Sequence, residues 1–113
     1  MSRYMVDKLL VEIDRTDEAL SSFRADPVEY LARWEESWDE PAPPHPVGGR
    51  LTPEERQAFV ERDWASLYAM GAHPYLLWHV VRSVHVAEGE DVRDVSARYV
   101  ESIRPHGHPD FST

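Results

Sequence analysis

Six histidines in a chain without cysteine are the side chains most able to bind a metal ion. Iron in non-haem oxygenases is commonly held by two His and one carboxylate. His79 and His85 stand six residues apart, which puts them on different sides of a helix. His106 and His108 could chelate an ion together with Asp110, but they belong to a polar tail without the supporting groups that metal ligands need. We therefore predict no metal site and no cofactor in this chain.

Motifs for catalysis are equally scarce. The sequence has no nucleophile elbow, no phosphate-binding loop, no dinucleotide fingerprint and no zinc-protease motif. Ser22, Ser66 and Ser83 have no evident base paired with them. We expect a chain that is not catalytic alone, although it could be a subunit of an enzyme.

Composition and charge limit the classes of partner. The 113 residues are 42% apolar, which is enough for one domain with a single modest core. A formal net charge of -9 argues against nucleic acid and against anionic membrane surfaces, because both require positive charge. No run approaches the roughly 20 apolar residues that span a bilayer, and no signal peptide is evident. These features, with the lack of cysteine, predict a cytoplasmic protein.

Helix starts and stops are concentrated between residues 51 and 78. Thr52 suits an N-cap, Pro53 suits the first helical position, and Glu55 stands where a capping box places its acid. Asp63 can cap a second short helix over residues 64–70. Gly71 can end that helix, since glycine adopts a left-handed C-terminal conformation without strain.

Elsewhere the apolar spacing is also helical, with no strand-like alternation. We predict an all-α fold, a compact single-domain bundle of about six short helices over residues 1–104. A Pro-rich loop is expected at 41–50 and a flexible polar tail at 105–113. Along the helix after Asp26 the residues Val28, Leu31, Trp34 and Trp38 are expected on a core or interface face, and Glu35, Glu36, Asp39 and Glu40 at a solvated end. Val92, Val95 and Tyr99 are expected to line one side of the last helix.

The helix opened by Pro74, over residues 75–85, differs from the others. No acid occurs between Ala72 and Ala87, and the apolar residues cover a wide arc, as expected of the most buried helix. Tyr75, His79 and Arg82 fall on a common stripe, with Trp78 on a neighbouring line. This edge could face a partner or an anionic aromatic acid. Alternatively, the helix is central and its few polar tips reach water or a carbonyl.

Over residues 22–81 the chain resembles the LigA family, the small (alpha) subunit of class III extradiol ring-cleavage dioxygenases. The resemblance rests on short sequence motifs that occur in the same order as in the family: Phe23-Arg24-Ala25-Asp26-Pro27, Tyr30-Leu31, Leu51-Thr52-Pro53, Arg62-Asp63, Gly71 and Pro74-Tyr75-Leu76-Leu77. His73 stands at an N-cap where the family more often shows Asn. The Pro-rich segment 41–49 looks like an insertion, and the family's long C-terminal region is missing.

The resemblance implies a non-catalytic small subunit that helps to cover the active site of a larger subunit in aromatic compound catabolism. The larger subunit would carry Fe(II), its ligands and the base. Gly71, Pro74 and Tyr75 would lie near the pocket mouth. His73 could cap the helix or contact the pocket mouth. To these we add Trp78, His79 and Arg82 from the helical stripe as residues of the substrate pocket or partner interface.

Two other interpretations remain open. Small LigA-like domains are also similar to the leader portion of borosin-type precursors, which a methyltransferase recognises. The chain would then be a freestanding peptide- or protein-binding domain. A third interpretation is a homo-oligomer held together by exposed tryptophans.

Overall fold

The computed structural model describes residues 3–37 and 51–106. The predicted loop at 41–50 lies outside these ranges, as do Trp38, Asp39, Glu40 and the tail from residue 107, which includes His108 and Asp110. The tail was expected to begin at residue 105, and the chain forms a 3-10 turn there, Arg104–His106.

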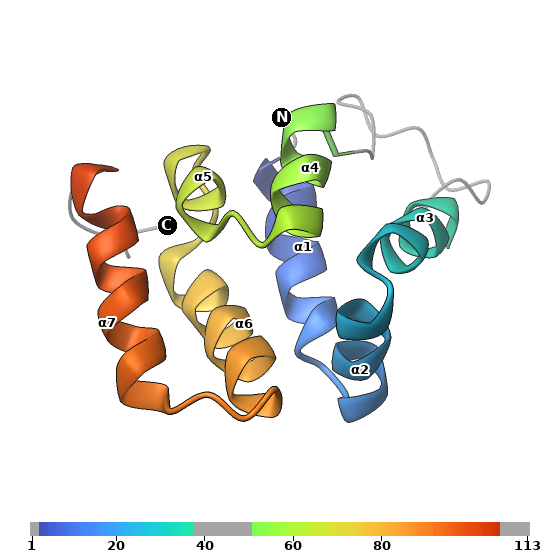
Figure 1. Cartoon of the computed structure of the whole chain (residues 1–113). Coiled ribbons are helices and arrows are strands. Elements are labelled where there is room, and N and C mark those ends of the chain that lie inside the picture. Colours follow the sequence, from blue (N-terminus) through green and yellow to red (C-terminus); the bar gives the residue numbers. More distant parts are fainter. Residues whose placement is uncertain (1–2, 38–50, 107–113) are drawn as a thin grey trace.

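Seven α-helices and no strand occur in the described residues, which confirms the predicted all-α bundle (Figure 1). The helices are α1 Arg3–Ile13, α2 Asp17–Ala25, α3 Pro27–Ser37, α4 Pro53–Glu61, α5 Trp64–Ala69, α6 Pro74–Ala87 and α7 Val92–Ile103. The count agrees with the expectation of about six short helices. None of the described helices combines the length and apolar character needed to cross a membrane.

The predicted helix caps are present. The Thr52 hydroxyl accepts the Glu55 N–H at 3.1 Å, and the Glu55 carboxylate accepts the Thr52 N–H at 2.8 Å, so the capping box is closed. Asp63 caps α5 by accepting the N–H of Ser66. Gly71 follows α5 with a φ of 100°, a backbone conformation that favours glycine.

Helix α6 lies at the centre of the arrangement. It contacts α1, α2, α5 and α7, and Figure 1 shows α7, α6, α1, α2 and α3 following one another across the molecule. Its inner residues Leu77, Val80, Val81 and Val84 are fully buried. The helix was expected to be the most buried one, but α1 has a larger share of buried residues: Met5, Val6, Leu9, Leu10 and Ile13.

One expectation about the helix faces is wrong, and two hold only in part. Val28 is not in the core, since it is 61% exposed at the start of α3, and Val92 is 44% exposed at the start of α7. Glu35 is buried instead of solvated, because α4 packs against α3 and brings Arg56 onto its carboxylate. Leu31, Val95 and Tyr99 are buried and Trp34 is partly buried, as their spacing predicts.

Candidate functional site

The outward edge of α6 consists of Tyr75, His79 and Arg82, which recur at intervals of four and three residues. Tyr75 is 56% exposed and Arg82 is exposed, while His79 is half-buried. The rings of Tyr75 and His79 meet edge to face, with centroids 4.4 Å apart. Among the described residues Arg82 has no ion-pair partner. An aromatic and cationic edge therefore lies open to solvent on a helix whose inner face is buried.

The first turn of α6 is held by a cap and by α1. Nδ1 of His73 accepts the N–H groups of Tyr75 at 3.2 Å and of Leu76 at 3.4 Å, which bears out the capping role expected of His73. Since Nδ1 accepts, the proton of a neutral His73 lies on Nε2. The N–H of His73 itself donates to a carboxylate oxygen of Asp7 on α1, at 2.8 Å. Pro74 occupies the first helical position.

Helix α1 lies beside α6. The contacts Asp7–His73 and Asp14–His79, the second at 4.0 Å, run in the same order along both helices, so α1 and α6 lie parallel. Tyr4 and Val11 on α1 are each about half exposed. The exposed side of α1 is thus partly apolar.

Trp78 does not belong to this edge. Its ring packs against that of Tyr99 on α7, with centroids 5.3 Å apart, and it joins the margin of the core. The Tyr99 hydroxyl is buried and has no hydrogen-bond partner among the described residues, and its burial raises the pKa of Tyr99. Of the seven residues proposed from the sequence, the structure groups Tyr75, His79 and Arg82, places Gly71, His73 and Pro74 at the helix start, and turns Trp78 inward.

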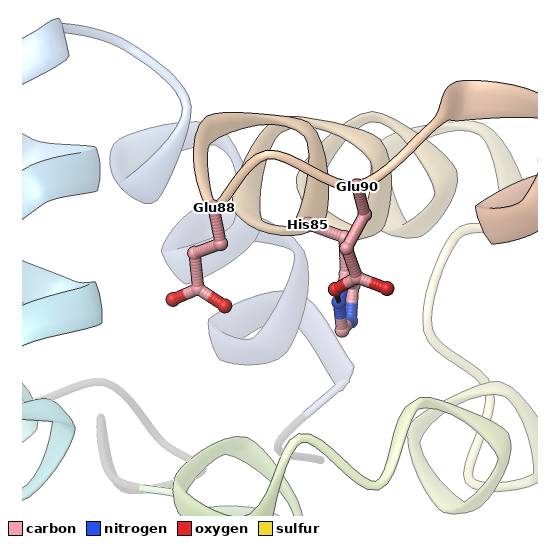
Figure 2. Close-up of side chains that lie close together, drawn as sticks. All are labelled: His85, Glu88 and Glu90. Atoms are coloured by element: carbon pink, nitrogen blue, oxygen red, sulfur yellow. Dashed lines mark hydrogen bonds and ion pairs between the residues drawn. The ribbon is translucent and has the colours of Figure 1, made fainter.

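A polar network at the other end of α6 was not foreseen from the sequence. His85, Glu88 and Glu90 extend from the end of α6 and the loop after it, toward the same side (Figure 2). The Nε1–H of Trp64 on α5 donates to Nε2 of His85 at 3.0 Å, and an indole nitrogen can only donate. A neutral His85 therefore carries its proton on Nδ1, which lies 2.5 Å from a carboxylate oxygen of Glu90.

Arginines surround the two carboxylates. Arg62 makes a bidentate contact with Glu88, at 2.6 and 2.7 Å, and Arg24 adds a third bond at 3.3 Å. Arg98 donates to Glu90. The hydrogen bonds from Arg62 are the main reason why the pKa of Glu88 falls from 4.5 to about 2. Those from His85 and Arg98 lower the pKa of Glu90.

This network does not suit a metal ion, although potential ligand atoms of His85, Glu88 and Glu90 lie within 4.8 Å of one another. Both nitrogens of His85 already have partners, and three guanidinium groups outnumber the two carboxylates. The arrangement instead fastens the loop after α6 to α2, α7 and the α4–α5 junction. Spacing in the sequence gave no sign that Trp64 or Arg62 would lie beside these acids.

Comparisons with protein-family models, with curated proteins and with solved structures give no match for this chain. The site is therefore described by its own residues: an exposed edge on α6 and a closed polar network at the C-terminal end of that helix.

Proposed function

We propose that this protein is a non-catalytic helical subunit that docks onto a larger protein through the outward edge of α6. The observation that carries the proposal is the exposure of Tyr75, beside His79 and Arg82, on the helix that otherwise forms the centre of the core. Aromatic residues and arginine are the types most enriched at the energetic centres of protein interfaces.

The resemblance to LigA suggests the kind of partner, a class III extradiol-type dioxygenase subunit that carries Fe(II). In such a complex the edge of α6, with Gly71, His73 and Pro74 at its start, would cover the mouth of the partner's pocket. Excluding water there would protect reactive intermediates of ring opening. The chemistry would remain with the partner.

The test is affinity capture from the native source with the tagged chain, followed by mass spectrometry and a ring-opening assay on a catechol. We expect a larger iron-containing chain to be recovered and to open the ring. Tyr75→Ala/Arg82→Ala should lose this chain. Val28→Ala/Arg33→Ala, a matched pair of exposed residues on α3, should retain it.

Other outcomes would overturn the proposal. Recovery of a methyltransferase would favour the leader-domain alternative, and recovery of the tagged chain's own copies alone would favour a homo-oligomer. Ring opening by the purified chain without a partner would show that the chain is itself catalytic.

A further inference from the structure

A second surface feature lies between α4 and α5, and it shares no lining residue with the edge of α6. It is a groove of about 510 Å³. Its lining residues come from one face of each helix: Pro53, Glu54, Gln57, Ala58 and Glu61 on α4, and Asp63, Ser66, Ala69 and Met70 on or beside α5.

Three of the side chains that line the groove are small. Ala58, Ser66 and Ala69 leave space that larger residues would fill. Met70 stands at the end of α5 and is 38% exposed, although its side chain is unbranched and apolar. Methionine adapts to irregular partner surfaces, so it suits a binding groove.

All charged residues of the lining are acids. Glu54, Glu61 and Asp63 contribute carboxylates, and no Lys or Arg is found among the described residues that line the groove. Asp63 is engaged by the N–H and hydroxyl of Ser66, whereas Glu54 and Glu61 have no ion-pair partner in the described part of the chain. The net charge of -9 adds a long-range attraction for cations to this local one.

We propose that the groove between α4 and α5 binds a basic amphipathic helix of a partner protein. Glu54 and Glu61 are seven residues apart on α4, which corresponds to about 10 Å along the helix. A partner helix lying along α4 would meet both carboxylates with bases seven residues apart, and the apolar side chains between them would enter the groove above Ala58 and Met70. The proposal does not depend on the docking role of α6.

The probe is an end-blocked, alanine-rich peptide of about 15 residues, with two lysines seven residues apart and leucines between them on the same face. Isothermal titration calorimetry at low salt should detect its binding to the full chain. Glu54→Gln/Glu61→Gln should weaken the binding about tenfold, because two facing charge pairs are lost. Met70→Ser should weaken it about threefold by removing an apolar contact.

The matched control is Glu18→Gln/Glu101→Gln, which removes two exposed carboxylates outside the groove. It changes the net charge of the protein by the same amount as the groove pair. We expect less than a twofold change for it, and Tyr75→Ala/Arg82→Ala should also bind the peptide like the wild type. Circular dichroism checks that each variant folds. The proposal is overturned if the wild type does not bind the peptide, or if the control pair weakens binding as much as the groove pair.

Discussion

The ion pair between Glu35 and Arg56 should couple α3 to α4 more strongly than a surface salt bridge would. The side chain of Glu35 is 8% exposed and that of Arg56 is 40% exposed, and two bonds of 2.9 Å join them. The hydrogen bond to Glu35 is the main reason that the pKa of Arg56 is raised. The pair also joins α3 directly to α4.

The two single substitutions should have unequal effects. Arg56→Ala leaves a buried carboxylate without its partner, which should lower the free energy of unfolding by about 2.5 kcal/mol, somewhat less than for a fully buried pair. Glu35→Ala leaves a guanidinium that can still reach water, so we expect a loss of about 1.5 kcal/mol. The double variant should lose about 2.5 kcal/mol, because the pair is already broken in either single variant. The coupling free energy is then about 1.5 kcal/mol.

Urea unfolding followed by circular dichroism at neutral pH measures all four species of this cycle. Glu36→Ala is the control, since Glu36 adjoins Glu35 in sequence but is exposed; its effect should stay within about 0.5 kcal/mol. A coupling free energy below about 0.5 kcal/mol, the range of exposed pairs, would refute the inference that burial strengthens this contact. So would a larger loss for Glu35→Ala than for Arg56→Ala.

Three further predictions concern the ends of α5 and α6. Because the pKa of Glu88 is lowered to about 2, its ion pairs stabilise the fold fully above pH 4.5 and lose their effect as the pH falls toward 2. Partial exposure limits this contribution to about 1 kcal/mol, so urea unfolding at pH 6 and pH 3 should show a smaller acid loss for Glu88→Gln than for the wild type. His85→Phe should lower the free energy of unfolding by about 2 kcal/mol, because the buried indole N–H of Trp64 loses its acceptor. The control His79→Phe should change the free energy of unfolding little. An equal loss of this free energy in the two variants would contradict the role of His85. Gly71→Ala should cost about 1 kcal/mol in thermal unfolding because of its positive φ, and an unchanged melting temperature would show that the turn relaxes.

Local signals in the sequence were sufficient to predict the helices. Thr52, Asp63 and Gly71 act within a few residues of themselves, so their roles as caps and stops can be read without knowing the tertiary fold. The helical period also identifies the buried side of a helix. It does not say which residues on that side a neighbour covers, so the exposure of Val28 could not be predicted.

Contacts between distant residues were beyond the reach of the same signals. Glu35 appeared to belong to a solvated run of acids, and only the docking of α4 makes it a buried partner of Arg56. His85 depends in the same way on Trp64, which precedes it by 21 residues. The outward stripe of α6 could be predicted because its members share one helix. The inward position of Trp78, on the line next to this stripe, depends on α7, because the Trp78 ring packs on Tyr99.

The two ends of α6 are fixed by different means, and this bears on how its outer edge could bind a partner. At the start, the His73 N–H is held by α1 and the His73 ring caps the helix. At the end, Arg24 donates to the carbonyl of Ala87 while His85 joins α5 to the following loop. The segment between these fixed ends carries Tyr75, His79 and Arg82 on a backbone whose inner face is fully packed. Such an edge has little backbone freedom to lose on association, so the entropy cost of docking is confined mainly to its side chains. A rigid edge of this kind favours a partner surface that is already shaped to receive it.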